Sequence, residues 1–211
     1  MPTTVAHRRY SRGLPIVTHE EFDIDMGNGK IVTCTLTNSA AAVDMWIFQT
    51  CRVREDVVGL DVEWRPFGEN NPVATLQLCV RRRCLVFQLL HSSHIPFSLL
   101  EFLRDPSLTF VGVGVYDDGV KLLNDYGLEV YRTVDLGKLA MSKLRLTHYP
   151  GLKFLALQVL SVDIVKPKNV TLSRWDNRWL TPAQVQYASV DAIASYEIGK
   201  TLRAWEVQSD A

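Results

Sequence analysis

The residues Val57-Val58-Gly59-Leu60-Asp61-Val62-Glu63-Trp64 decide the fold, because they form a short apolar run with two carboxylates near its end. Such a run predicts a buried β-strand. Alternate residues of a strand point to the same face of a sheet, so Asp61 and Glu63 are expected to converge. Two like charges beside an apolar run cost free energy, because both are desolvated and they repel each other. A divalent cation that prefers oxygen ligands would offset this cost, and a carboxylate pair solvated at the strand end is the alternative.

The sequence on both sides of this run predicts an α/β fold. An alternating pattern over residues 20–37, around the turn Gly27-Asn28-Gly29, is typical of a β-hairpin. Strands that alternate with helices further along the chain indicate parallel strands joined by crossover connections. The expected sheet is mixed, with three antiparallel strands followed by parallel strands, and helices flank it. The other elements are expected as helices at 40–52, 96–104 and 118–126, as strands at 74–80, 84–89, 108–115 and 133–136, and as mainly helical structure over 137–205.

Length and net charge limit the number of domains and the kind of ligand that the chain can bind. It has 211 residues, and 23 Lys and Arg balance 23 Asp and Glu, so the formal net charge is zero. Affinity for a polyanion would therefore have to come from local patches or from bound cations. Residues 1–15 are expected to be a flexible tail and residues 16–211 a single domain, with its core over about 55–205.

The expected compartment follows from cysteine usage and from the lack of a visible leader. Four cysteines, Cys34, Cys51, Cys79 and Cys84, form no Cys-x-x-Cys pair and are expected as thiols in a reducing compartment. The first residues contain no apolar segment typical of a secretory signal, and no apolar run approaches the roughly 18 residues of a membrane span. We expect a protein without a membrane partner that is located in the cytoplasm, with the nucleus as the alternative.

A phenol and a carboxylate lie on one face of a predicted helix near the C-terminal end. Thr181, Pro182 and Gln184 form the pattern of a capping box with proline at the first helical position. Tyr187 and Asp191 are four residues apart, so they lie about one turn apart on the same face of this helix. The alternative is an ordinary amphipathic helix whose tyrosine packs at the rim of the core.

A third acidic feature follows the apolar stretch Phe110-Val111-Gly112-Val113-Gly114-Val115-Tyr116-Asp117-Asp118. It predicts a strand that leads into the start of a helix. Helix N-termini favour carboxylates, so capping alone accounts for either aspartate. Spacing alone does not say whether Asp117 or Asp118 contributes to a site.

Together these motifs resemble those of the DEDDy 3′–5′ exonucleases, in the branch that contains the Werner-type enzymes and ribonuclease D. The shared order is Asp-x-Glu on a first strand, an Asp at the start of a later helix, and Tyr-x-x-x-Asp near the C-terminus. The similarity covers about residues 57–202 and includes the segments 72–78 (PVATLQL), 110–114 (FVGVG), 151–156 (GLKFLA) and 172–175 (LSRW). It implies a ribonuclease-H-like three-layer fold and the hydrolysis of phosphodiester bonds from a free 3′ end, which releases nucleoside 5′-monophosphates.

The resemblance also assigns roles to individual residues. The family pattern implies two divalent cations, Mg²⁺ or Mn²⁺, held by Asp61, Glu63, Asp118 and Asp191. The segments 112–115 and 121–122 place the motif on Asp118 rather than on Asp117. Tyr187 would orient the attacking water, since an unperturbed phenol is a poor base at neutral pH. The histidine variant of the superfamily would have histidine at position 186, where this chain has Gln186, so the tyrosine class fits better.

Contacts with the rest of the substrate are expected from aromatic and basic side chains. Trp64, next to Glu63, offers a ring for a terminal base, although packing in the core is the alternative. Lys153 and Arg174 lie in the region that the family uses beside its active site, as do Lys166 and Lys168, and we expect backbone contacts from them.

The small size of the chain and the segments 109–113 (TFVGV) and 137–140 (GKLA) resemble the plant RISC-interacting clearing exoribonucleases. That resemblance implies single-stranded RNA as substrate, a ring-shaped homo-oligomer, a hexamer, and association with Argonaute. A Werner-like DNA exonuclease is the first alternative. A catalytically inactive member that binds nucleic acid or protein is the second alternative.

Overall fold

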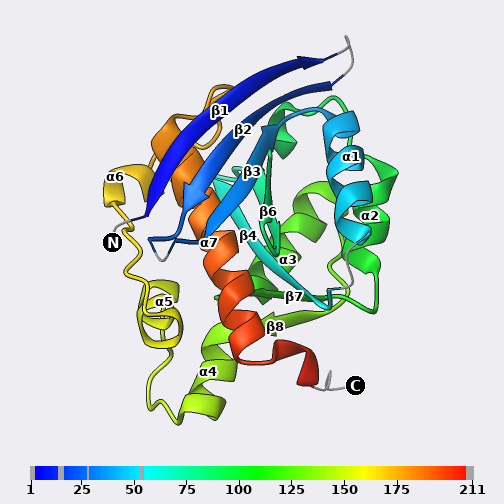
Figure 1. Ribbon diagram of the computed structural model, residues 1–211. Coiled ribbons are helices and arrows are strands. Elements are labelled where there is room, and N and C mark those ends of the chain that lie inside the picture. The colour runs from blue at the N-terminus through cyan, green and yellow to red at the C-terminus, as the bar shows by residue number, and fades with distance from the viewer. Residues whose placement is uncertain (1–2, 14–16, 28, 53–54, 208–211) are drawn as a thin grey trace.

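The computed structural model describes residues 3–13, 17–27, 29–52 and 55–207 (Figure 1). One sheet of eight strands lies between two layers of helices. The strands are β1 (Thr4–Gly13), β2 (Val17–Asp25), β3 (Ile31–Thr37), β4 (Val57–Trp64), β5 (Val73–Val80), β6 (Arg83–Phe87), β7 (Thr109–Gly112) and β8 (Thr133–Asp135). The helices are α1 (Ala40–Cys51), α2 (Phe97–Arg104), α3 (Val115–Tyr126), α4 (Leu136–Leu144), α5 (Leu152–Leu160), α6 (Lys168–Thr171) and α7 (Pro182–Thr201), with short 3₁₀ turns at Leu89–His91 and Ala204–Glu206.

The sheet has the order β1-β2-β3-β6-β5-β4-β7-β8. Strands β4, β5 and β6 are antiparallel, whereas β7 pairs in parallel with β4 and β8 in parallel with β7. The predicted mixed sheet, with three antiparallel strands followed by parallel ones, is confirmed. The parallel pairing directs the carboxyl ends of β4, β7 and β8 to the same edge of the sheet, and Asp61 and Glu63 lie near the end of β4.

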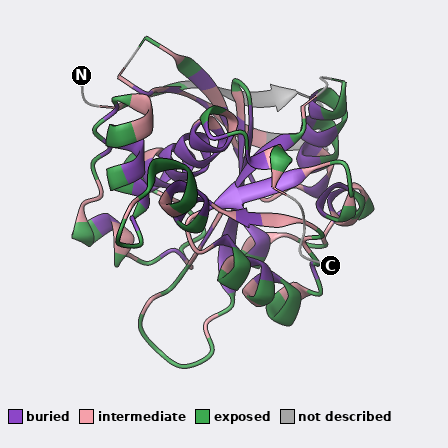
Figure 2. Cartoon of the chain, turned by 90° about the horizontal axis from the view of Figure 1, so that it is seen from below, coloured by how far each residue is buried: buried purple, intermediate pink, exposed green. Residues whose placement is uncertain are grey.

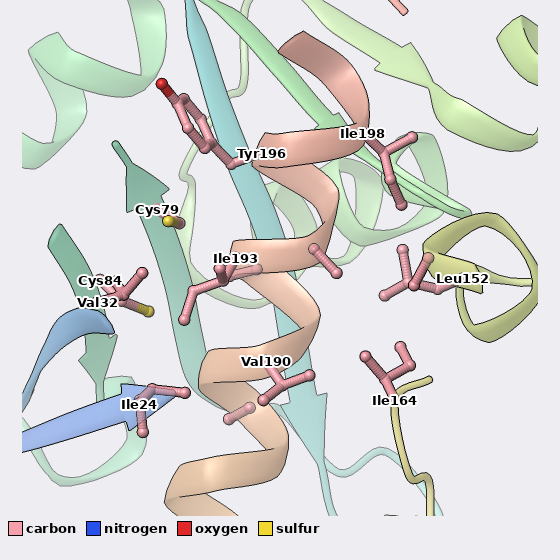
Figure 3. Packing of buried hydrophobic residues seen from close by; sticks show 14 of the residues in the cluster. Ile24, Val32, Cys79, Cys84, Leu152, Ile164, Val190, Ile193, Tyr196 and Ile198 are labelled. Carbon is pink, nitrogen blue, oxygen red and sulfur yellow. The ribbon is translucent and has the colours of Figure 1, made fainter. Parts of the chain in front are cut away.

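Each face of the sheet is covered by its own hydrophobic layer. One layer contains buried residues of α4, α5 and α7, and the other contains buried residues of α1, α2 and α3. Figure 2 shows buried strands at the centre and exposed residues on the surrounding helices and loops. In Figure 3, Ile193 of α7 faces Cys79 and Cys84 of the sheet, while Val190 and Ile198 point toward Ile164 and Leu152. Helix α7 is therefore buried nearly all round, and this packing sets its position relative to β4.

The N-terminal segment differs from the expected flexible tail over residues 1–15. Within the described residues, Thr4–Gly13 forms strand β1, which pairs antiparallel with β2, so this expectation was wrong. Without β1, the edge of β2 would present unpaired backbone groups, and residues 4–13 satisfy them. A polar, basic composition does not exclude an edge strand, where charged side chains are common.

The predicted hairpin over 20–37 is present as β2 and β3, which pair antiparallel. Position 28 of its turn lies outside the described residues, as do 14–16 in the turn before β2. Strand β3 joins the rest of the sheet through a parallel pairing with β6. The sequence patterns did not indicate this connection, because it unites segments about 50 residues apart.

Helix α3 begins at Val115, three residues before the expected start at 118. The preceding residue is Gly114, whose φ of 80° is in the left-handed region. Glycine adopts this conformation at little cost, so the chain turns at once from β7 into the helix. As a result, Asp117 and Asp118 both lie in the first turn of α3.

The start of α7 has the predicted cap. The side chain of Thr181 accepts a hydrogen bond from the Gln184 amide, and the Gln184 side chain accepts one from the Thr181 amide. Pro182 occupies the first helical position.

Among the described residues, no helix combines the length and the hydrophobicity that crossing a bilayer requires.

Candidate active site

Three carboxylates from two elements meet at the carboxyl end of β4. Asp61 and Glu63 come from β4 and Asp191 from α7, and one oxygen from each lies within 4.8 Å of the others. A Cβ atom at Gly59 of β4 would stand 2.0 Å from the carbonyl oxygen of Ala192, so only glycine lets α7 approach this closely. The absence of a side chain at position 59 therefore brings Asp191 next to the pair on β4.

Burial and mutual repulsion disfavour the charged form of these carboxylates. Burial, followed by the charges of Asp191 and Glu63, raises the pKa of Asp61 well above its ordinary value. Burial and then the charge of Asp191 raise the pKa of Glu63 to about 9. The Oδ2 atom of Asp61 is buried and has no hydrogen-bond partner among the residues that the structure describes. Three clustered carboxylates with an unpartnered buried oxygen fit a hard divalent cation such as Mg²⁺ or Mn²⁺.

A lysine supplies positive charge to this cluster. The Nζ atom of Lys166 lies 2.6 Å from Oδ2 of Asp191 and 5.2 Å from the centre of the Tyr187 ring. Burial lowers the pKa of Lys166, but Asp191 more than reverses this effect and raises it above its ordinary value. Although burial raises the pKa of Asp191, Lys166 acts in the opposite direction. Lys166 thus points into the carboxylate cluster, and the sequence patterns gave no indication of this ion pair.

Tyr187 lies one helical turn before Asp191 on α7. Its ring is 5.9 Å from that of Trp175, measured between centroids, and the residue is buried. Burial and then the charge of Asp191 raise the pKa of the phenol to about 12. The hydroxyl group therefore stays protonated at neutral pH, so it can form hydrogen bonds but cannot act as a base.

Asp118 lies beside the group of three rather than within it. Its charge raises the pKa of both Asp61 and Glu63. Its own pKa is raised to about 7 by burial, then by Asp117 and Asp135. Asp117 is exposed. Of the two neighbouring aspartates, Asp118 is therefore the one whose charge acts on Asp61 and Glu63.

Asp135 at the end of β8 holds the turn that positions Asp118. Its Oδ2 atom accepts hydrogen bonds from the Gly114 amide at 2.7 Å and from the Tyr149 hydroxyl at 2.8 Å. Its Oδ1 atom accepts one from the Lys138 amide at 2.8 Å and so caps α4. Sequence reasoning missed Asp135, because its partners lie on three separate segments.

The three expected substrate-binding side chains have partners other than the carboxylates. Trp64 is 38% exposed, so it does not pack in the core, and Lys121 Nζ lies 5.2 Å from its ring centre. Lys153 pairs with Asp163 at 3.3 Å, and Arg174 pairs with Asp176 at 3.0 Å. Among the described residues, no hydrogen bond or ion pair joins Trp64, Lys153 or Arg174 to the carboxylate cluster.

The known proteins that this chain resembles in sequence are 3′-5′ exonucleases. The sequence model of the 3′-5′ exonuclease family matches residues 39–204. A 3′-5′ exonuclease of Arabidopsis thaliana is 38% identical over 151 residues, which cover 69% of this chain and 52% of that protein. The bifunctional 3′-5′ exonuclease/ATP-dependent helicase WRN of Mus musculus is 36% identical over 151 residues, covering 70% of this chain and 11% of that protein. The chain thus matches about half the length of the first relative and about a tenth of the second.

Solved structures show the same fold. Escherichia coli RNase D superimposes with a TM-score of 0.69 at 20% identity, covering 80% of this chain and 44% of that one. Brucella melitensis NrnC superimposes with a TM-score of 0.63 at 21% identity, covering 72% of this chain and 73% of that one. These two likenesses support the ribonuclease-H-like fold. The family match over residues 39–204 shows that the chain belongs to the 3′-5′ exonuclease family, as a DEDDy-type member.

Proposed function

We propose that this chain removes nucleotides one at a time from the free 3′ end of single-stranded nucleic acid, with RNA as the preferred substrate. The observation that carries the proposal is the convergence of Asp61, Glu63 and Asp191 around an unpartnered buried carboxylate oxygen. Such a cluster has no structural benefit of its own, because burial and repulsion oppose its ionisation. It suits a site that holds cations over a phosphodiester bond.

The donor set supports two divalent cations. Asp61, Glu63 and Asp191 would hold one, and Asp61 with the nearby Asp118 would hold the other. Bound cations would polarise the scissile phosphate and lower the pKa of a water molecule. The four carboxylates would have to be ionised to hold them, so the raised pKa values of Glu63 and Asp118 make binding stronger at higher pH.

The remaining side chains would orient the reactants. The protonated hydroxyl of Tyr187 would hold the attacking water by a hydrogen bond, because its pKa of about 12 excludes a role as base. Lys166 offsets the charge of Asp191 and brings three N–H donors to the place where a phosphate would lie. The products would be nucleoside 5′-monophosphates and a strand shortened by one nucleotide.

The preference for RNA rests on the segments 109–113 and 137–140, which resemble the RISC-interacting clearing exoribonucleases. On the same resemblance we propose that the chain forms a ring-shaped homo-oligomer and that this oligomer associates with Argonaute in the cytoplasm. A Werner-like DNA exonuclease is the second candidate, and the similarity to the mouse WRN protein supports it. Light scattering coupled to size-exclusion chromatography would give the number of subunits.

A 5′-fluorescein-labelled single strand tests the activity. With Mg²⁺ we expect a ladder that shortens from the 3′ end, and we expect EDTA or the variant Asp61→Ala to stop it. Matched RNA and DNA strands give the preference from the ratio of their initial rates. A ladder of equal strength from Asp61→Ala would show that the chemistry takes place elsewhere, and DNA degraded faster than RNA would reverse the assigned preference.

A further inference from the structure

A groove of about 560 Å³ runs along β8, the edge strand of the sheet on the side away from the hairpin. Strand β8 packs against α3 on one side and against α4 on the other (Figure 1). The side chains that matter for its chemistry are Tyr116, Tyr131, Arg132, Asp135 and Lys138. None of them belongs to the carboxylate cluster.

One end of the groove lies on the side of the candidate active site. Tyr116, at one end, lies two residues before Asp118 in the first turn of α3. Asp135, at the same end, holds the Gly114 amide from which that turn begins. Strand β8 is two strands away from β4, and adjacent strands are roughly 4.8 Å apart, so this end of the groove is about 10 Å from Asp61. The other end, at Tyr131 and Arg132, lies further from the site along β8.

The groove presents flat rings and positive charge. Tyr116 is 66% exposed and Tyr131 is 62% exposed, although large aromatic side chains are usually more buried. Lys138 is exposed and forms no ion pair with any residue that the structure describes. Arg132 donates to the carbonyl oxygens of Trp205 and Val207, at 3.0 and 2.6 Å, which keeps its guanidinium group beside the groove.

Asp135 is the one carboxylate among the described residues that line the groove, and it is already engaged. Asp135 accepts hydrogen bonds from the Gly114 amide, the Lys138 amide and the Tyr149 hydroxyl. Its single negative charge stands against the two positive charges of Arg132 and Lys138. The balance favours an anionic ligand, and the two exposed rings favour one that carries bases.

We propose that this groove binds the part of a single-stranded polynucleotide that lies on the 5′ side of the scissile bond. Bases stack on Tyr116 and Tyr131, as they do on aromatic platforms of single-strand binding proteins, and Lys138 contacts the phosphate backbone. The inference rests on the proposed function and extends it. It predicts that long substrates are bound more tightly than short ones, and it names the side chains responsible.

Two substrates of different length test the inference in the enzyme. A 12-nucleotide single-stranded RNA reaches through the groove to Tyr131, whereas a trinucleotide is too short to reach this far end. In Tyr131→Ala, we expect the ratio of kcat/KM for the 12-mer over the trinucleotide to fall at least fivefold. Tyr131→Phe, which keeps the ring, should restore most of the ratio. Phe97→Ala removes an equally exposed ring from α2, outside the groove, and should leave the ratio as in the wild type.

Binding measured without hydrolysis separates this inference from the proposed function. In the Asp61→Asn background, the fluorescence anisotropy of a 5′-labelled 12-mer should show at least fivefold weaker binding after Tyr131→Ala. Lys138→Gln should lower the slope of log affinity against log salt concentration by about 1, as the loss of one phosphate contact requires. Lys143→Gln, on the same helix but paired with Glu206, should not change that slope.

Each contrary result has its own meaning. An equal loss on the 12-mer and the trinucleotide, or unchanged 12-mer binding in a folded Tyr131→Ala protein, would overturn the inference. A changed oligomeric state with unchanged RNA affinity would also overturn it and would assign the groove to contact between protein chains. If the wild type degrades neither substrate, the proposed function fails, and the anisotropy measurement still decides whether the groove binds RNA.

Discussion

Gly59 of β4 lies directly against Ala192 of α7, so that a Cβ atom at position 59 would stand 2.0 Å from the Ala192 carbonyl oxygen and 2.7 Å from the Tyr196 amide nitrogen. Asp61 follows two residues later on β4, and Asp191 immediately precedes Ala192 on α7. The same close approach therefore packs the core and sets the distance between the two aspartates. Stability and the geometry of the candidate site are coupled at this point.

The substitution Gly59→Ala should damage both properties. The two closest atoms belong to the α7 backbone, and the third, the Cβ atom of Tyr196 at 2.9 Å, moves only with that backbone, so the helix has to move away from β4. We expect the free energy of unfolding to fall by about 3 kcal/mol, the upper part of the range for overpacked cores, measured by urea denaturation. Gly151→Ala is the control, because a Cβ atom there meets nothing within 4 Å. Equal stability of the two variants would mean that α7 is not held against β4 as described.

The periodicity of strands and helices predicts which side chains of the site share a face of their own element. Asp61 and Glu63 share a face because they are two residues apart on a strand, and Tyr187 and Asp191 share one because they are four apart on a helix. What periodicity could not show is how far apart two elements lie. That distance depends on Gly59, whose importance becomes visible only when Ala192 is placed opposite it.

The missed features all depend on contacts between distant segments. Asp135 joins residues 114, 138 and 149, and Lys166 reaches Asp191 across 25 positions of the chain. Strand β1 was expected to be a tail because its composition is polar, whereas its order comes from pairing with β2. Local propensity predicts where the helices and strands lie, whereas contacts between distant segments determine how they pack and pair.

The pKa of Glu63 predicts how stability depends on pH in the metal-free protein. Its pKa is about 9 in the folded state and near 4.5 when unperturbed, so between these values the folded chain keeps a proton that the unfolded chain has lost. Stability therefore falls as the pH rises through this window. Glu63→Gln removes the effect, and in EDTA at pH 8 we expect it to raise the free energy of unfolding by at least ~1 kcal/mol, or the melting temperature by roughly 2–4 °C.

The same variant should show little gain near pH 4, where the carboxyl group of the wild type is protonated in both states. Addition of Mn²⁺ at pH 8 should stabilise the wild type much more than Glu63→Gln, since a neutral amide is a poorer ligand. Differential scanning calorimetry at both pH values checks these expectations. A Glu63→Gln protein that is less stable than the wild type in EDTA at pH 8 would contradict the assigned repulsion.

Lys166 should stabilise the metal-free site and compete with metal ions. Lys166→Met leaves the buried carboxylate of Asp191 without its partner, so we expect the metal-free protein to lose about 1–2 kcal/mol. This is less than the cost of breaking a fully buried pair, because the lysine side chain is partly exposed. Removing a neighbouring positive charge should also tighten Mn²⁺ binding about fivefold, as measured by titration calorimetry.

Lys168→Met provides the matched control for that prediction. Lys168 lies two residues away, is exposed and forms no ion pair with a described residue, so its loss should change neither stability nor Mn²⁺ affinity. Weaker Mn²⁺ binding in Lys166→Met would show instead that the ammonium group orders the carboxylates for the metal ion.

Tyr187→Phe should separate metal binding from turnover. The variant keeps the ring that packs on Trp175 and removes only the hydroxyl group, so we expect the Mn²⁺ affinity to stay within about twofold of the wild type. The hydroxyl group would orient the attacking water, and its loss should lower kcat by about 100-fold, the lower end of the range for a positioned proton-transfer group. Because the phenol titrates only near pH 12, the pH dependence of kcat between 7 and 10 should keep its shape in the variant. Single-turnover rates on labelled RNA at saturating Mn²⁺ measure this effect, and an unchanged rate would remove Tyr187 from the reaction.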